Sequence, residues 1–294
     1  MPYAHHGPVD IYYETFGDPT DPALLLVNGL GSQCINYRTE WCEGFVDRGF
    51  FTIRFDNRDV GLSTKIEQVT PNLGAVLQAL GDGKDPEVAY RLTDMAADAV
   101  AVLDELGIDR AHVMGVSMGG MIVQQLAIDH PDRLLSMTSV MSTTGDPDVG
   151  QASPAAFAIL TGPPATSRAS AIAGQQTSIR TFGSPGHYDA DRVAELAGEA
   201  YDRGFYPAGV ARQIIGIVAS GSRSEGLRQI QVPALILHGD ADTLIDISGG
   251  RRTAECIPGA RFEVLEGMGH DSPPAYWDRW IDLVAEHAGV TASS

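Results

Sequence analysis

The sequence has few cysteines, few basic residues and no long apolar run, and each shortage excludes a class of protein. Its three cysteines, Cys34, Cys42 and Cys256, are odd in number and lack CxxC or metal-ligand spacing, which indicates reduced structural thiols. Only 20 lysines and arginines accompany 38 acidic residues, a formal net charge of −18, so nucleic acid and anionic membranes would be repelled.

Two kinds of segment are also missing from the sequence. No stretch of about eighteen apolar residues could span a membrane, and the first residues do not follow the pattern of a secretory signal. The histidines and carboxylates show no metal-ligand spacing. We therefore expect a cytoplasmic protein with no metal, no cofactor, and no nucleic-acid or membrane partner.

What the sequence does contain is an alternation of two hydrophobic periods. Residues 92–106 repeat apolar side chains at helical spacing, with Thr93 placed to cap the helix and Gly107 to end it. Apolar runs of strand length surround this helix and others. The alternation predicts an α/β fold with a mostly parallel central sheet flanked by helices. The strands are expected at 9–16, 23–28, 50–56, 111–116, 134–142, 233–239 and 261–267.

One long segment does not follow this alternation. Residues 146–229 contain Ala-rich helical stretches broken by Gly and Pro, but no convincing strand. Because the strand pattern resumes at 233, we expect a helical cap, or lid, inserted between late strands. The predicted organisation is an α/β core of residues 1–145 and 230–294, with a cap of residues 146–229. A further helix is expected within residues 70–90.

The stretch "HVMGVSMGG", residues 112–120, holds a serine between glycines at the spacing G-x-S-x-G. An apolar strand precedes it and a helix-forming run follows, so the chain must turn sharply at Ser117. Such a turn forces the serine into a sparsely populated backbone conformation and holds its hydroxyl clear of the sheet, at the positive end of the new helix. Ser117 is therefore a candidate nucleophile.

Possible partners for Ser117 follow two later strands. The loop "GDADTL" offers Asp240 and Asp242, and the loop "MGHDSPP" offers His270. An alcohol is a poor nucleophile at neutral pH, so an imidazole must take its proton and a carboxylate must orient the imidazole. Loops at the carboxyl ends of parallel strands meet at one edge of a sheet, which would bring the three groups together.

These motifs resemble the α/β-hydrolase superfamily over essentially the whole chain. The resemblance rests on "GVSMGG", "HGDADTLI", "GMGHDSPP" and "FDNRDVGLS", the last at residues 55–63. More narrowly, the chain is similar to aclacinomycin-type methyl esterases and small-molecule carboxylesterases. The resemblance implies Ser117 as nucleophile and His270 as base. It implies Asp242 as the acid rather than Asp240, since the superfamily acid usually lies three residues after the loop glycine, here Gly239.

Acyl transfer also needs donors for the negative charge of a tetrahedral intermediate. Two backbone N–H groups aimed at that oxygen form an oxyanion hole. We expect one from Met118, directly after the nucleophile, and one from Leu30 in the turn "NGLGS". The family commonly has histidine where this chain has Asn28, but the donation comes from the backbone. The aspartates and Arg58 of "DNRD" are expected to brace the loop around the site.

The expected function is a serine hydrolase that cleaves carboxylic esters of small to medium apolar molecules through an acyl-enzyme. Its partner would be a small-molecule ester, and the chain would be a monomer or homodimer. Carbon–carbon bond hydrolases, lactonases, thioesterases, proline iminopeptidases and cofactor-free haloperoxidases or perhydrolases keep the same triad and stay open as alternatives. Epoxide hydrolases and haloalkane dehalogenases use an aspartate nucleophile and are disfavoured. A non-enzymatic binding protein usually has a broken triad, which this sequence does not show.

Overall fold

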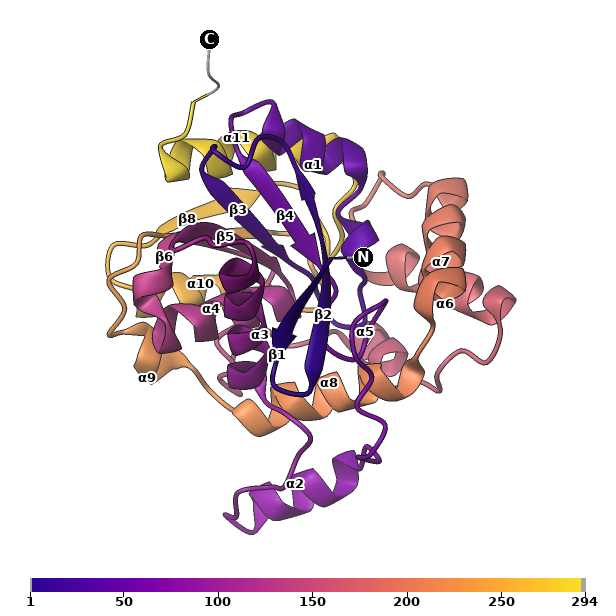
Figure 1. Cartoon of the computed structure of the whole chain (residues 1–294). Helices are drawn as coiled ribbons and strands as arrows, with labels where there is room; N and C mark the ends of the chain where they lie inside the picture. The colour runs from indigo at the N-terminus through magenta and orange to yellow at the C-terminus, as the bar shows by residue number, and fades with distance from the viewer. Residues whose placement is uncertain (1, 292–294) are drawn as a thin grey trace.

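Eight strands form one sheet in the order β1-β2-β4-β3-β5-β6-β7-β8 in the computed structural model, which describes residues 2–291 (Figure 1). The pairs β1–β2 and β2–β4 are antiparallel. The other six strands, β4, β3, β5, β6, β7 and β8, run parallel to one another. The strand bounds are β1 (Tyr3–His6), β2 (Val9–Phe16), β3 (Ala23–Val27), β4 (Phe51–Phe55), β5 (Ala111–Val116), β6 (Leu134–Val140), β7 (Ala234–Gly239) and β8 (Arg261–Leu265).

The sheet confirms the α/β class and the seven strands expected from the sequence. The strand β3 is buried over its whole length, as its continuous apolar run predicts. The additional strand is β1, whose letters "YAHH" have no apolar alternation. It pairs with β2 at the sheet edge, where Ala4 faces Ile11.

Helices cover both faces of the sheet (Figure 1). One face carries α3 (Leu92–Glu105), α4 (Met118–Asp129) and α10 (Ser248–Cys256), and the other carries α1 (Thr39–Val46) and α11 (Trp277–Ala288). Each face has its own buried apolar cluster. The second cluster includes Trp41, which stacks on Trp277 with ring centroids 5.3 Å apart. Short 3-10 turns lie at Cys34–Asn36, Pro131–Arg133 and Pro274–Tyr276.

The start of α3 differs from the prediction. The N-cap residue is Arg91, and its backbone N–H donates to the Asp94 carboxylate at 2.8 Å. Thr93 lies inside the helix, where its hydroxyl donates to Asp129 at 2.9 Å. The Asp94 carboxylate therefore accepts a hydrogen bond from the backbone at the helix start, which we expected Thr93 to cap. The end is as predicted, since Gly107 has a φ of +67° there.

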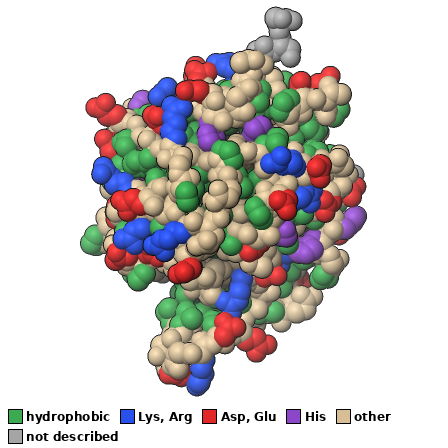
Figure 2. Space-filling model, turned by 90° about the vertical axis from the view of Figure 1, so that its left-hand side faces the viewer, with side chains coloured by type: hydrophobic (Ala, Val, Ile, Leu, Met, Phe, Trp, Pro, Cys, Tyr) green, Lys and Arg blue, Asp and Glu red, His purple; other side chains and the backbone are tan. Residues whose placement is uncertain are grey.

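Five helices lie between β6 and β7, and the first four of them are called the inserted helices below. They are α5 (Pro154–Leu160), α6 (Arg168–Phe182), α7 (Ala190–Gly204) and α8 (Pro207–Ser220), and the short α9 (Ser224–Leu227) follows them. The helix expected within residues 70–90 is α2 (Leu73–Gly81), which contacts α8. It forms the lower lobe in Figure 2, where apolar side chains reach the surface, and Leu77 is 53% exposed.

Candidate functional site

The candidate site lies at the carboxyl ends of the parallel strands. The turn after β3 carries Leu30, the turn after β5 carries Ser117, and the loops after β7 and β8 carry Asp242 and His270. Side chains that are far apart in sequence meet here because parallel strands end at one edge of the sheet.

Ser117 stands on a strained turn between β5 and α4. Its φ of 55° and ψ of −119° are unusual for a residue with a side chain. The neighbouring glycines make the turn possible, because a Cβ atom on Gly119 would lie 2.1 Å from the carbonyl oxygen of Val27. A Cβ on Gly115 would lie equally close to the carbonyl of Gly119. The G-x-S-x-G spacing is thus a packing requirement where β3, β5 and α4 meet.

The ring of His270 lies between the hydroxyl and the carboxylate. The Ser117 Oγ is 2.9 Å from His270 Nε2, and His270 Nδ1 is 2.7 Å from Asp242 Oδ2. The geometry therefore joins the serine, histidine and aspartate named from the sequence in one hydrogen-bonded row. A Nδ1–H that donates to the carboxylate leaves Nε2 free to accept from the serine hydroxyl.

Asp242 is buried and held in place by the backbone. Its Oδ1 accepts from the N–H groups of Leu244 and Ile245 at 2.9 and 3.0 Å. Burial alone would raise the pKa of this carboxyl, but the facing His270 and the hydrogen bonds around it hold the pKa well below its usual value. The group stays ionised and is oriented toward the imidazole.

Asp240 and His238 flank this carboxylate in different ways. The Asp240 Oδ1 accepts from the N–H of Gly267 at 2.7 Å, so this aspartate braces the loop after β8. His238 is fully buried, and its Nε2 donates to the carbonyl of Ile245 at 2.8 Å while lying 3.5 Å from Asp242 Oδ2. His238 therefore contacts both the backbone and the carboxylate of the acid loop.

The turn after β3 lies directly beside Ser117. A Cβ on Gly29 would be 3.3 Å from the Ser117 Cβ, which shows how closely the two segments approach. The N–H of Ser32 donates to the Gly29 carbonyl at 3.2 Å and closes the turn that contains Leu30. On the other side, Met118 is the first residue of α4, where backbone N–H groups have no partner within the helix. Leu30 and Met118, the two residues named from the sequence as oxyanion donors, therefore lie in segments that adjoin Ser117.

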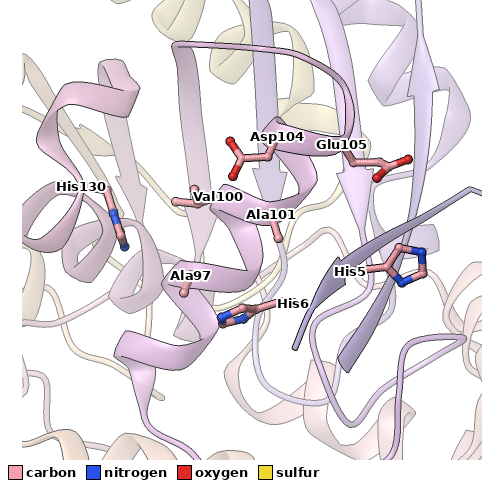
Figure 3. A pocket seen from close by; sticks show the side chains of 8 residues that line it. All are labelled: His5, His6, Ala97, Val100, Ala101, Asp104, Glu105 and His130. Carbon is pink, nitrogen blue, oxygen red and sulfur yellow. The ribbon is translucent and has the colours of Figure 1, made fainter. Parts of the chain in front are cut away.

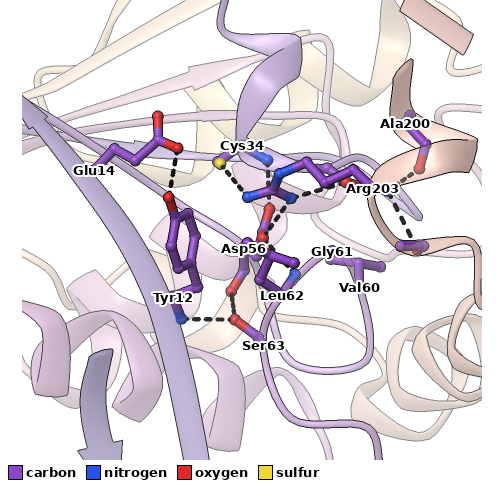
Figure 4. A network of polar contacts seen from close by, with 12 residues as sticks. Tyr12, Glu14, Cys34, Asp56, Val60, Gly61, Leu62, Ser63, Ala200 and Arg203 are labelled. Atoms are coloured by element: carbon purple, nitrogen blue, oxygen red, sulfur yellow. Dashed lines mark hydrogen bonds and ion pairs between the residues drawn. The ribbon is translucent and has the colours of Figure 1, made fainter. Parts of the chain in front are cut away.

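The loop 56–63 is tied to the inserted helices by two ion pairs whose carboxylates are fully buried. Arg203 of α7 donates to Asp56 Oδ2 at 2.7 Å, and it also reaches Gln33 and the Cys34 sulfur (Figure 4). Arg212 of α8 donates two hydrogen bonds to Asp59, at 2.8 and 2.9 Å. The sequence pattern predicted that these aspartates brace the loop, but it did not identify their arginine partners.

A second connection joins the inserted helices to the histidine loop. The backbone N–H of His270 donates to the carbonyl of Phe182 at 2.6 Å, and the two rings meet edge to face with centroids 6.1 Å apart. The Ser184 hydroxyl accepts from the N–H of Gly269 at 2.9 Å. The Ser184 N–H in turn donates to Asp271 at 2.9 Å. Burial raises the pKa of this Asp271 carboxyl. The end of α6 therefore holds the loop that carries the histidine.

Other polar features lie away from this row of residues. A surface cavity between β1 and α3 contains His5, His6 and His130 (Figure 3), but His5 pairs with Asp10 and His6 with Asp98. Within residues 2–291, no group of three or more histidine, cysteine or acidic side chains is arranged to hold a metal ion. None of the helices in this same range is long and apolar enough to cross a membrane. The three cysteines are buried and free of disulfides, and burial raises the pKa of Cys42 to about 12.

A model of the alpha/beta hydrolase fold family matches residues 22–273, and the sheet order and strand-end motifs agree with it. The chain therefore belongs to the alpha/beta hydrolase family, as the sequence motifs predicted.

The chain is also similar to individual proteins of this family. The chain is 29% identical to rhodomycin D methylesterase DnrP of Streptomyces peucetius over 95% of both chains. It is 27% identical to 3-oxoadipate enol-lactonase 2 of Acinetobacter baylyi, over 88% of this chain and 85% of that one. The crystal structure of the enol-lactonase from Burkholderia xenovorans superposes with a TM-score of 0.73 at 22% identity, covering 98% of this chain and all of that chain.

Proposed function

We propose that the protein is a serine hydrolase of carboxylic esters that works through an acyl-enzyme. The proposal rests on one observation: the His270 ring lies between Ser117 and Asp242, 2.9 Å from the Ser117 hydroxyl and 2.7 Å from the Asp242 carboxylate. This arrangement is the one that activates a serine for attack on a carbonyl carbon. Similarity to a methylesterase over nearly the whole chain supports an ester as the substrate.

In the proposed mechanism, the Ser117 oxygen attacks the ester carbonyl while His270 Nε2 takes the hydroxyl proton. Asp242 stabilises the imidazolium that forms. Collapse of the tetrahedral intermediate breaks the bond to the alcohol oxygen, which leaves with the proton from His270. A water molecule then attacks the acyl-enzyme with the same assistance, which releases the acid and restores Ser117. The sum is one ester and one water converted to one acid and one alcohol.

The N–H groups of Met118 and Leu30 would bind the oxyanion in both steps. Two observations support this assignment: Met118 directly follows Ser117 at the start of α4, and Leu30 follows Gly29, where a Cβ would lie 3.3 Å from the Ser117 Cβ. Rigid backbone donors stabilise charge that develops only in the transition state, so they raise turnover more than they raise affinity for the ester.

The segment 146–229 would act as a cap over the site and set which ester fits. Phe182 of α6 packs against the His270 ring, and Val210 of α8 packs against Gly31. The Phe182 ring adjoins His270, and Val210 adjoins the turn that carries Leu30, so apolar side chains of this segment lie around the site, which favours a small to medium apolar acyl or alcohol group.

Lactone hydrolysis is a second candidate, favoured by the similarity to enol-lactonase 2. A lactone is an internal ester, so the same serine chemistry would open its ring. The product alcohol would then stay attached to the acyl group until water releases both together.

The proposal is tested with a panel of methyl, alkyl and aryl esters together with lactones and thioesters. We expect ester or lactone hydrolysis by the wild type and stoichiometric labelling by an organophosphonate, located at Ser117 by intact mass and peptide mapping. Ser117→Ala should lose both. Labelling that persists in Ser117→Ala, or that maps to Ser63 or Ser142, would overturn the assignment of the nucleophile.

A further inference from the structure

A polar side chain of the inserted helices reaches into the turn beside Ser117. Gln213 of α8 is fully buried, and its Oε1 accepts from the backbone N–H of Gly31 at 2.9 Å. Its Nε2 donates to the carbonyl of Arg58, also at 2.9 Å. One side chain therefore joins α8, the turn after β3 and the loop after β4.

The orientation of this amide is determined by its partners. Gly31 offers an N–H and needs an acceptor, whereas the Arg58 carbonyl needs a donor. Only one of the two amide orientations satisfies both. A buried amide or backbone group without a hydrogen bond is unfavourable, so the Gly31 N–H and the Arg58 carbonyl both depend on the Gln213 amide.

The turn that Gln213 contacts is the one that carries Leu30. The Ser32 N–H closes it onto the Gly29 carbonyl, and Gly31 has a φ of +66°. A positive φ at the third position of a closed turn is typical of type II, in which the central peptide has one preferred orientation. That peptide joins Leu30 to Gly31. Its N–H is the group bound by Gln213, so rotation of the peptide would break the bond.

The helix α8 is itself held firmly at this point. Arg212, the preceding residue, pairs with Asp59 through two hydrogen bonds and is buried like its partner. Val210 packs on the outer side of the turn, where a Cβ on Gly31 would be 3.0 Å from its Cγ2 atom. The turn is thus fixed between α8 on one side and Ser117 on the other.

We propose that Gln213 is a positioning residue for the oxyanion hole. It holds the turn of residues 29–32 in the conformation that directs the Leu30 N–H toward the oxygen of the tetrahedral intermediate. The inference rests on the proposed serine hydrolysis. It adds that one part of the catalytic geometry comes from the inserted helices and not from the α/β core.

The test is Gln213→Met, which keeps the length and apolar volume of the side chain but makes neither hydrogen bond. We expect kcat to fall by about 10- to 100-fold, up to the cost of a misplaced catalytic group and less than the roughly 10²- to 10³-fold cost of a lost oxyanion donor, with KM changed less than about 3-fold. Active-site titration with the phosphonate should normalise kcat to folded protein. The matched control is Gln176→Met, which removes a hydrogen bond to Ala190 within the inserted helices and should leave kcat unchanged.

A transition-state analogue separates positioning from general damage. A trifluoromethyl ketone forms a tetrahedral adduct on the serine and requires the oxyanion hole, so its affinity should fall in Gln213→Met by the same factor as kcat/KM. Leu30→Pro, which removes the N–H at a turn position that accepts proline, should give a loss that is not additive with that of Gln213→Met. Additive losses would mean that Gln213 does not act through Leu30 and would overturn the proposal.

Gln213→Asn covers the case in which Gln213→Met does not fold. It keeps a polar amide at the buried position but is one methylene too short for both bonds, so the same loss of kcat is expected. Normal kcat and normal analogue affinity in either folded variant would refute the role of Gln213. A wild-type protein that hydrolyses none of the esters or lactones and is not labelled at Ser117 would instead refute the proposed function.

Discussion

The two oxygens of the Asp242 carboxylate bind different partners, the backbone of the acid loop and the ring of His270. Oδ1 accepts from the backbone N–H groups of Leu244 and Ile245, while Oδ2 faces His270 Nδ1 at 2.7 Å. The backbone therefore fixes the direction in which the carboxylate points, and the imidazole takes the orientation that this direction dictates. Asp240, two residues earlier, contacts Gly267 instead.

This difference predicts opposite results for two equivalent substitutions. Asp242→Asn should lower kcat by roughly 10³- to 10⁴-fold, because an amide no longer selects the imidazole tautomer that accepts the Ser117 proton. Asp240→Asn should keep most of the activity. Steady-state kinetics with one ester, together with circular dichroism to verify folding, compares the two variants. A dead Asp240→Asn beside an active Asp242→Asn would transfer the role of the acid to Asp240.

The contact between Phe182 and His270 predicts a change in substrate preference. Phe182→Leu should shift KM and the ranking of ester chain lengths by about 1–3 kcal/mol, the range for methylene-scale changes in an apolar pocket. Turnover of a small acetate ester should change much less. The matched control is Phe157→Leu, because Phe157 is 57% exposed and its ring makes little packing contact. Equal shifts in both variants would argue against a pocket bordered by Phe182.

The buried pair of Asp59 and Arg212 predicts a specific dependence of stability on pH. Burial alone would raise the pKa of Asp59, but hydrogen bonds from Arg212, Ile66 and Tyr90 lower it below the ordinary value. A carboxyl with a lowered folded-state pKa stabilises the protein above its unfolded-state pKa of about 3.9 and loses this contribution as the pH falls toward the folded-state value. The free energy of unfolding should therefore decrease below about pH 4.

Asp59→Asn tests this pair with a residue that tolerates the positive φ at this position. The variant should lose about 3–5 kcal/mol at pH 7, because Arg212 is left as a buried charge without its partner. It should also show a shallower loss of stability between about pH 4 and pH 2.5. Urea unfolding across that range measures both effects. Parallel curves for the two proteins would show that the Asp59 carboxyl does not supply the pH dependence.

Arg203 and Arg168 form ion pairs in contrasting surroundings and should differ in their effect on stability. Arg203→Met should lower the unfolding free energy by about 3–5 kcal/mol, since Asp56 is fully buried and would lose its cation. Arg168→Met should change it by less than about 1 kcal/mol, because Arg168 and Asp202 are both more than half exposed. Thermal or urea unfolding gives the comparison. Similar small losses would show that Arg203 does not anchor α7.

The strands and the strand-end motifs could be predicted from sequence because their signals are local. The run "ALLLV" predicts a strand buried on both faces wherever it occurs, and G-x-S-x-G describes a turn that only glycines permit. The strand β1 had no such signal, since "YAHH" is stabilised mainly by pairing with β2. The helix start at Arg91 was missed because a competing carboxylate, Asp94, satisfies it.

The polar contacts of the inserted helices could not be predicted for a different reason. Gln213 bonds to residues 155 and 182 positions away, and Arg203 bonds to Asp56 across 147 positions. One glutamine or arginine in an Ala-rich amphipathic helix looks like a solvated side chain. Its role depends on which loops the tertiary fold brings against it, and a single sequence does not contain that information.

The backbone contact between Gly119 and Val27 limits how such a protein can diverge. A single methyl group on Gly119 would lie 2.1 Å from the Val27 carbonyl, so a saturation library at this position should yield one functional residue. Half-exposed positions of α6 and α7, by contrast, should accept many replacements. If the inserted helices set which ester fits, as proposed, new substrate preferences would arise there, while Gly119 stays unchanged in functional descendants.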